Sequence, residues 1–299
     1  MSDPIVEKIS ELKKKHNAII LAHNYQRGEI QDIADYVGDS LGLSQQAAKA
    51  DADLIVFCGV HFMAETAAIL SPDKTVIMPD EHAGCPMANM VTARELRKKK
   101  ELYPNAKVVC YVNTTADVKA ESDICCTSSN AVKIVSSIPE GEEILFIPDK
   151  SLGAYVSSCL NREMIYWDGY CPTHHRILAD QIVKIKSEHP EAEVVVHPEC
   201  TPDVIALADN VASTSGILRY ANSSNAKEFV IGTEIGILHR LRKESPDKIF
   251  MPVTPLSDCP NMKLNTLEKV LWSLEDIQYV ITVPDEIAKK ALSAIQKML

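Results

Sequence analysis

Three Cys-Pro pairs divide the chain at almost regular intervals. The cysteines are Cys85, Cys171 and Cys259, which stand 86 and 88 residues apart. Spacing this even predicts three copies of one structural unit, each of which contributes a cysteine to a shared metal site. Thiolates are soft ligands that suit iron–sulfur clusters or zinc, and proline stiffens the backbone beside the sulfur. Three protein ligands leave a fourth position open, which is typical of a catalytic metal.

The three segments that end in these cysteines repeat one order of sequence patterns. Each begins with a short, largely β-branched run that predicts a buried strand. These runs cover residues 18–22, 108–112 and 194–196, and the polar residues after them are His23, Asn113 and His197. A hydroxyl residue stands 17, 15 and 17 positions further on, at the expected start of a helix: Ser40, Ser128 and Thr214. A strand, a helix and another strand then lead to each Cys-Pro pair, as a triplicated unit requires.

The alternation of strands and helices predicts an α/β fold of three similar small units, each with a parallel sheet and right-handed crossovers. We place the units at residues 1–92, 93–186 and 187–269. We expect segment 270–299, with a possible strand at 279–283 and a helix from 284, to complete the first unit. Ligands collect at the carboxyl ends of parallel strands. A pseudo-threefold arrangement with these ends facing inward would bring the cysteines and the polar residues around one cavity.

The composition excludes several classes of protein. With 299 residues, of which 46% are apolar, the chain can bury a large core. A net charge of -10 argues against nucleic acid or an anionic membrane as the main partner. Residues 1–15 contain no apolar signal-peptide core, and no run approaches the roughly 20 apolar residues of a membrane span, so we expect a cytoplasmic protein. Nine cysteines suit reduced thiols or metal ligands better than disulfides in a chain of this length.

Short motifs along the chain resemble the quinolinate synthase family of bacterial and archaeal NAD biosynthesis. They are AHNYQ at 22–26, GDS at 38–40, FMAET at 62–66, CPMAN at 85–89, YVN at 111–113, TSSNA at 127–131 and HPEC at 197–200. The resemblance implies a threefold α/β architecture around a central [4Fe-4S] cluster held by Cys85, Cys171 and Cys259. It also implies a transferase that condenses iminoaspartate (iminosuccinate) with dihydroxyacetone phosphate to quinolinate, with loss of phosphate and water.

The residue chemistry suits anionic substrates of this kind. Hydroxyls at helix starts, with the free backbone amides and the positive helix end beside them, can bind carboxylate or phosphate. We therefore expect these strand-end and helix-start residues to bind substrate: His23, Ser40, Asn113, Ser128, His197, Ser213 and Thr214. The resemblance implies that four neighbouring residues belong to the same site: Tyr111, Val112, Pro198 and Glu199. Ser215 separates Thr214 from Gly216, where we expect glycine to follow directly, so the choice between Ser213 and Thr214 stays open.

Four residues are candidates for catalysis. Glu199 is the expected general acid/base, because the condensation needs proton transfers. Tyr111 and Tyr25 would position or cover the substrate. The resemblance assigns His174 to the same pocket, although the pair Cys171-x-x-His174 also matches half of a zinc site. An open iron would act as a Lewis acid and ease the departure of a hydroxyl group as water.

Residue chemistry alone leaves two other functions open. A cluster-dependent hydro-lyase would also use three cysteines and an open iron, whereas an iron–sulfur sensor or electron carrier would normally close its cluster with four protein ligands. We expect small-molecule partners, and transient contact with the aspartate oxidase or dehydrogenase that makes the unstable imine. The other cysteines are expected to be small core residues, although adjacent Cys125 and Cys126 could be redox-active: Cys58, Cys110, Cys125, Cys126, Cys159 and Cys200.

Overall fold

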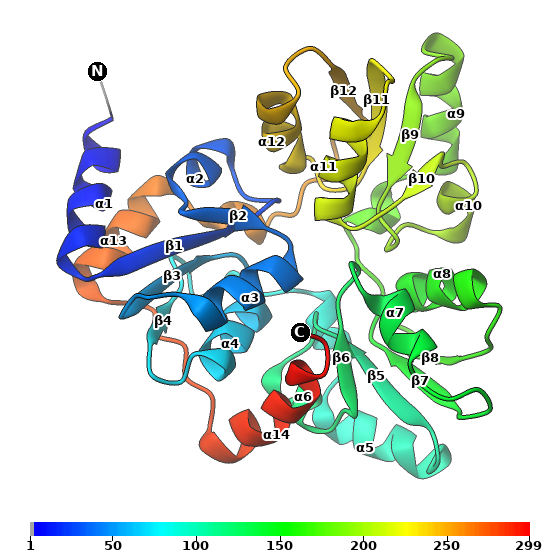
Figure 1. The fold of residues 1–299 in the computed structure, drawn as a ribbon, viewed down its shortest axis with the longest axis horizontal. Coiled ribbons are helices and arrows are strands. Elements are labelled where there is room, and N and C mark those ends of the chain that lie inside the picture. The colour runs from blue at the N-terminus through cyan, green and yellow to red at the C-terminus, as the bar shows by residue number, and fades with distance from the viewer. Residues whose placement is uncertain (1–2) are drawn as a thin grey trace.

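Three sheets of four parallel strands build the molecule. The computed structural model describes residues 3–299, and its strand orders are β2-β1-β3-β4, β6-β5-β7-β8 and β10-β9-β11-β12. In each unit the first strand lies between the second and the third, so one topology occurs three times. The three units surround a common centre (Figure 1). The predicted α/β fold with three similar parallel-sheet units is therefore confirmed.

Each unit alternates strands with helices. The first contains α1 (Pro4–Lys15), β1 (Ala18–His23), α2 (Gly28–Ile33), β2 (Tyr36–Gly38), α3 (Ser40–Lys49), β3 (Leu54–Cys58), α4 (His61–Leu70) and β4 (Thr75–Ile77). The second contains α5 (Ala93–Leu102), β5 (Lys107–Tyr111), α6 (Ala116–Ala120), β6 (Ile124–Cys126), α7 (Ala131–Ser136), β7 (Ile144–Ile147), α8 (Lys150–Leu160) and β8 (Ile165–Tyr166). The third contains α9 (Ala179–Glu188), β9 (Glu193–Val196), α10 (Pro202–Ile205), β10 (Asn210–Val211), α11 (Thr214–Ser223), β11 (Glu228–Gly232), α12 (Ile237–Glu244) and β12 (Ile249–Pro252).

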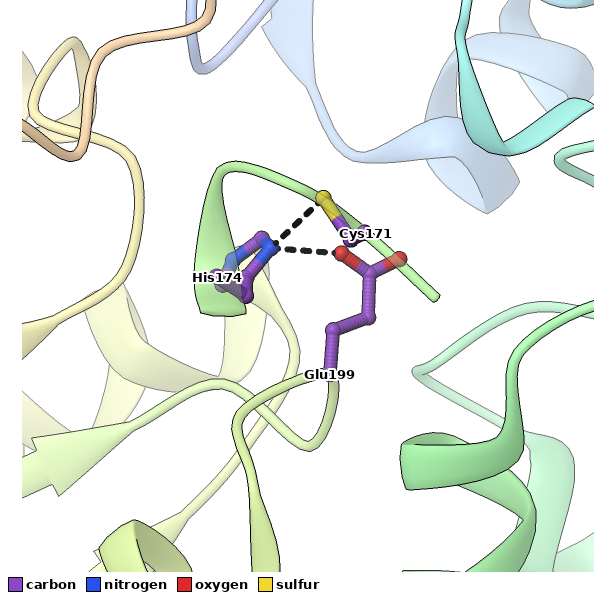
Figure 2. Close-up of side chains that lie close together, drawn as sticks. All are labelled: Cys171, His174 and Glu199. Atoms are coloured by element: carbon purple, nitrogen blue, oxygen red, sulfur yellow. Dashed lines mark hydrogen bonds and ion pairs between the residues drawn. The ribbon is translucent and has the colours of Figure 1, made fainter. Parts of the chain in front are cut away.

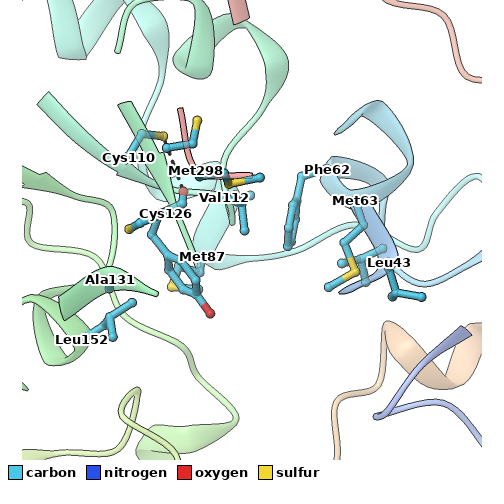
Figure 3. Packing of buried hydrophobic residues seen from close by; sticks show 14 of the residues in the cluster. Leu43, Phe62, Met63, Met87, Cys110, Val112, Cys126, Ala131, Leu152 and Met298 are labelled. Carbon is cyan, nitrogen blue, oxygen red and sulfur yellow. Dashed lines mark hydrogen bonds between the residues drawn. The ribbon is translucent and has the colours of Figure 1, made fainter. Parts of the chain in front are cut away.

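A buried strand pattern explains why these segments form sheets. All five residues of β3 are buried, as are all four of β7, because helices cover both faces of each parallel sheet. Phe62, Met63 and Val112 belong to one large apolar cluster that extends across the units (Figure 3). Among residues 3–299, no helix has the length and apolar character that crossing a membrane requires.

One aspartate per unit fixes the start of the sheet. Asp35, Asp123 and Asp209 each accept a hydrogen bond from the backbone amide 15 residues earlier, at 2.7, 2.8 and 2.8 Å. Each aspartate also donates its own amide to the carbonyl of that same residue. The aspartates stand 88 and 86 residues apart, so they define the equivalence of the three units residue by residue.

The helix after each Cys-Pro pair packs against the following unit. Helix α5 contacts α6 and helix α9 contacts α10, whereas α13 (Leu267–Asp276) returns to contact α1 and β3 of the first unit. This return closes the ring of three units. The last helix, α14 (Asp285–Gln296), packs against α6 and β6 of the second unit and against α4 of the first (Figure 1). The domain boundaries at residues 92, 186 and 269 stay a prediction.

Two local expectations are wrong. Residues 279–283 do not form a strand: only an isolated antiparallel bridge joins Val280 to Ile77, and a few backbone hydrogen bonds there cover the edge of β4. Cys159 is exposed on α8, and the other five non-Cys-Pro cysteines are buried as expected. All nine cysteines are free, including Cys125 and Cys126 on β6.

Candidate active site

The sheet register aligns the strand ends of the three units. His23 is paired with Gly38 and Tyr111 with Cys126, and His197 follows the Val196–Val211 pair. His23, Tyr111 and His197 are thus equivalent. The expectation that Asn113 is the counterpart of the two histidines is wrong, because each equivalent residue stands 17 positions before its helix-start hydroxyl.

One cavity receives side chains from all three units. It holds about 630 Å³ of space outside the protein atoms, part of it open to solvent. Its walls include all three Cys-Pro cysteines and most of the predicted polar residues: His23, Tyr25, Ser40, Cys85, Tyr111, Asn113, Ser128, Cys171, His174, His197, Glu199, Thr214 and Cys259. Val60, Phe62, Met63 and Met262 add an apolar part to the same wall. The predicted convergence of the three units on a common cavity is therefore observed.

Each Cys-Pro pair opens a short 3₁₀ turn that points backbone amides at the sulfur. The sulfur atoms accept hydrogen bonds from the amides three residues further on, which belong to Ala88, His174 and Met262. Burial is the largest cause that raises the pKa of each of these thiols, to about 12 for Cys85. A thiolate in such a place needs a cation beside it, and a bound metal supplies one.

Buried carboxylates hold two of the three turns. The amide of Cys259 donates to Glu234 Oε1 at 3.0 Å, and the amide of Cys171 donates to Asp149. The sheet register makes Asp149 and Glu234 equivalent residues that follow β7 and β11. These carboxyl groups accept from the backbone, and Glu234 Oε1 also lies 2.9 Å from Lys263 Nζ, so the sulfur atoms stay available as ligands.

Glu199 lies at the centre of the polar network. Tyr111 OH donates to Glu199 Oε1 at 2.6 Å. His174 Nδ1 lies 2.7 Å from Glu199 Oε2, and Figure 2 shows these two side chains facing each other. Burial alone would raise the pKa of Glu199, but His174, His197 and the Tyr111 hydroxyl outweigh it and lower the pKa. Glu199 is therefore a carboxylate that can accept a proton. Burial, followed by the Glu199 charge, raises the pKa of Tyr111, which stays a neutral donor.

His174 connects Glu199 to a second tyrosine. Its Nδ1 is 3.1 Å from Cys171 Sγ, and its Nε2 is 2.9 Å from Thr233 Oγ1. Thr233 Oγ1 is 2.5 Å from Tyr25 OH. When Nδ1–H donates to Glu199, Nε2 accepts from Thr233, so a continuous chain of hydrogen bonds runs from Tyr25 to Glu199. The ligand atoms of Cys171, His174 and Glu199 lie within 4.8 Å of one another, so this trio could also hold a single metal ion.

The two strand-end histidines have the same tautomer. His23 Nδ1 accepts from the amide of Tyr25 at 3.2 Å, and His197 Nδ1 accepts from the amide of Glu199 at 3.3 Å. Burial is the main cause that lowers the pKa of His23 to about 4 and that of His197 to about 3. Both rings are therefore neutral near pH 7 and carry the proton on Nε2. His197 Nε2 lies 3.2 Å from Ser128 Oγ.

The helix starts meet where the three units join. Asp39 Oδ1 caps α3 through the amide of Gly42 at 2.8 Å, and Ser213 Oγ caps α11 through the amide of Gly216 at 3.3 Å. A Cβ at Gly216 would approach Ala212 Cβ to 2.8 Å, so the first turn of α11 needs a glycine there. Glycine three residues after the cap is thus the shared pattern of the first and third units.

Ser129 joins these caps across the unit boundaries. Its hydroxyl is 2.5 Å from Asp39 Oδ2 and 3.0 Å from Ser213 Oγ. Because Ser213 serves as a cap, it is Thr214, the next residue, whose side chain lines the cavity. Ser40 takes the same place after Asp39.

A comparison with known families agrees with this site. A family model described as "Quinolinate synthetase A protein" matches residues 7–299. The quinolinate synthase of Methanosarcina barkeri is 57% identical over 295 residues, which cover 99% of this chain and 97% of that protein. The chain belongs to the quinolinate synthase family. Two further quinolinate synthases are as similar: that of Dehalococcoides mccartyi is 58% identical over 295 residues (99% and 97% covered), and that of Thermodesulfovibrio yellowstonii 57% over 300 residues (100% and 99%).

Three residues that the quinolinate synthase resemblance suggested do not line the cavity. Val112 is buried in the apolar cluster, Ser213 caps α11, and Pro198 lies in the turn between His197 and Glu199. In contrast, Asp39, Ser129 and Thr233 belong to the polar network around the site although they were not among the expected site residues. When the three units are aligned on Asp35, Asp123 and Asp209, their helix starts become equivalent. Asp39 and Ser129 lie at these helix starts, so this alignment indicates both of them. Thr233 carries no comparable signal.

Proposed function

We propose that this chain synthesises quinolinate for NAD biosynthesis by condensing iminoaspartate with dihydroxyacetone phosphate, with release of phosphate and water. Membership of the quinolinate synthase family supports the reaction. The observation that carries the proposal is Glu199, a buried carboxylate held by Tyr111 and His174 beside a cavity that three turn cysteines also line. A carboxylate in this position suits the proton transfers that a condensation between two carbonyl-type carbons requires.

We propose that Cys85, Cys171 and Cys259 hold a [4Fe-4S] cluster. Three sulfur donors share a single cavity, and each sulfur accepts backbone amides from its own turn, as thiolate ligands of iron–sulfur clusters do. The donor set therefore fits the cluster. When bound, such a cluster would supply an open iron as a Lewis acid for a substrate hydroxyl or carboxylate.

The remaining residues divide into proton carriers and substrate ligands. Glu199 would remove a proton from the carbon that becomes the nucleophile and later return it to the departing hydroxyl. Tyr111 and His174 would hold Glu199 in place, and Tyr25 would exchange protons with His174 through Thr233. His23 and His197 present neutral N–H donors to substrate oxygens, Asn113 offers a buried oxygen with no partner among residues 3–299, and Ser40, Ser128 and Thr214 would bind carboxylate or phosphate at the helix starts.

The source of the imine belongs to the same proposal. Iminoaspartate is chemically unstable, so an aspartate oxidase or dehydrogenase that makes it would deliver it in transient contact with this chain. Both substrates are small anions, which the hydroxyl and imidazole donors of the cavity suit.

The test is anaerobic reconstitution with iron and sulfide, followed by an assay for quinolinate from oxaloacetate plus ammonia and dihydroxyacetone phosphate. We expect quinolinate and stoichiometric inorganic phosphate. A protein that carries a four-iron cluster and forms no quinolinate would overturn the reaction. Water loss without phosphate release would identify a hydro-lyase instead.

Ligation has its own test. Cys171→Ser should abolish the visible absorption of the reconstituted cluster, because two thiolates hold a four-iron cluster poorly. Cys58→Ser is the matched control, since Cys58 is a buried residue of β3 that does not line the cavity. Equal absorption in the Cys171→Ser and wild-type proteins would contradict the assignment.

A further inference from the structure

Asn24 connects a surface arginine to the cavity wall. It follows β1 in the first unit, is fully buried, and donates from Nδ2 to Thr214 Oγ1 of the third unit at 2.9 Å. Arg240, on α12 of the third unit, donates to Asn24 Oδ1 at 3.0 Å and to the carbonyl of Val37 at 2.7 Å. Its Nε also donates to Glu244 Oε1 at 2.6 Å, which holds the guanidinium in place.

The arginine determines which way the asparagine amide faces. A guanidinium has no acceptor, so the Asn24 atom that faces Arg240 must be the oxygen. The amide nitrogen must then face Thr214. This removes the usual ambiguity between the oxygen and the nitrogen of an asparagine side chain.

The orientation of Asn24 fixes the role of the Thr214 hydroxyl. Its oxygen accepts from Asn24, so its single hydrogen is left to donate. Among residues 3–299, no protein acceptor for this hydrogen is found, and Thr214 lines the cavity. The residues equivalent to Asn24 in the other two units are Val112 and Pro198, which have no side-chain donor.

We infer that Asn24 and Arg240 are positioning residues that hold the Thr214 hydroxyl as a hydrogen-bond donor to an anionic oxygen of a substrate, carboxylate or phosphate. This inference rests on the proposed function, in which Thr214 is a substrate ligand. Loss of Arg240 allows the Asn24 amide to turn its oxygen toward Thr214 and to accept the hydroxyl hydrogen itself, and loss of Asn24 leaves the hydroxyl free to rotate. Replacing Asn24 or Arg240 should therefore weaken substrate binding through Thr214, because neither of the two residues lines the cavity itself.

The experiment is steady-state kinetics of reconstituted Asn24→Ala, Arg240→Met and Arg240→Lys variants, with each substrate varied in turn. Losing one oriented hydrogen bond should raise the KM of one substrate about 3- to 10-fold with kcat changed less than about twofold. A rise for dihydroxyacetone phosphate would assign Thr214 to phosphate, and a rise for the imine would assign it to a carboxylate. Arg240→Lys, which keeps a donor, should recover part of the loss.

A double-mutant cycle separates positioning from a merely structural role. In a Thr214→Val background, Asn24→Ala should not raise KM further, because the hydroxyl it orients is gone. Arg242→Gln is the matched control: Arg242 lies on the same helix, is exposed, and should leave both KM values unchanged.

Two outcomes would overturn the inference. One is additive effects of Asn24→Ala and Thr214→Val on KM, and the other is an unchanged KM for both substrates in a folded Arg240→Met protein. If Asn24→Ala does not fold, the partly exposed Arg240 carries the test alone. An inactive wild-type protein would instead point to failure of the proposed function.

Discussion

At the residue scale, the charge of Glu199 depends on the side chains that donate hydrogen bonds to it. Tyr111 and His174 come from the second unit and Glu199 from the third, so the ionised carboxylate exists only where two units meet. A carboxylate this deeply buried would otherwise be protonated, because desolvation disfavours its charge. The neighbouring donors reverse that effect and keep Glu199 ionised.

Replacing Glu199 by glutamine should preserve the fold and abolish most of the activity. Glutamine keeps the size and the acceptor oxygen but cannot take up a proton, so kcat should fall by about 100-fold or more. The measurement is the rate of quinolinate formation by protein with a matched cluster content. Glu228→Gln, at a partly exposed position on β11, is the control. Activity within about tenfold of wild type would exclude Glu199 as the essential base.

At the element scale, an ion pair adds to the packing by which α13 closes the ring. Lys269 of α13 donates to Asp80, which lies in the loop after β4. Burial would raise the pKa of Asp80, but Lys269 and the amide of His82 outweigh it and lower the pKa. The pair is mostly shielded from solvent, so it stabilises more than an exposed pair does.

Asp80→Asn should lower the free energy of unfolding by roughly 1–2 kcal/mol at pH 7. The folded pKa is depressed, so the contribution is present above the ordinary carboxyl pKa of 3.8 and is lost as the pH falls through the folded value. The difference in the free energy of unfolding between wild type and variant, measured in urea, should therefore shrink toward zero as the pH falls below the folded pKa of Asp80. Asp168→Asn removes an exposed pair with Lys150 and should change stability little. An equal effect of the two substitutions would contradict the role given to Asp80.

Elements also show how far the sequence alone could lead. The strands and the threefold repeat were predictable, because parallel strands covered on both faces are apolar throughout and recur at a fixed interval. The alignment of Tyr111 with His23 was missed although the 17-residue spacing to Ser128 indicated it, since a tyrosine at a strand end also suits ordinary packing. The His174–Thr233 contact joins two units, and no local pattern reports which loops meet across such a boundary.

At the scale of the whole molecule, α14 joins the first and second units. Ala291, Ala294 and Ile295 are buried on its inner face, and Lys297 donates to the carbonyl of Asp123 at 2.7 Å. Asn130, in the turn before α7, donates to the carbonyl of Met298 at 2.9 Å. The terminal helix therefore holds together two of the units that form the cavity (Figure 1).

Ile295→Ala should destabilise the protein by about 2–4 kcal/mol, because it leaves a cavity in a fully buried apolar cluster. The measurement is the urea midpoint at constant m-value. Ile249→Ala is the control, since that side chain is exposed on β12. Similar losses for the two variants would argue against α14 as a structural link.

The return of α13 to the first unit has an implication for origin. A ring in which every helix after a Cys-Pro pair packs on the next unit has the connectivity of a cyclic trimer whose subunits have been fused end to end. An ancestral trimer would have presented three identical strand-end residues around its axis. In a single chain that constraint does not apply, and the equivalent positions hold histidine in the first and third units, His23 and His197, and tyrosine in the second, Tyr111.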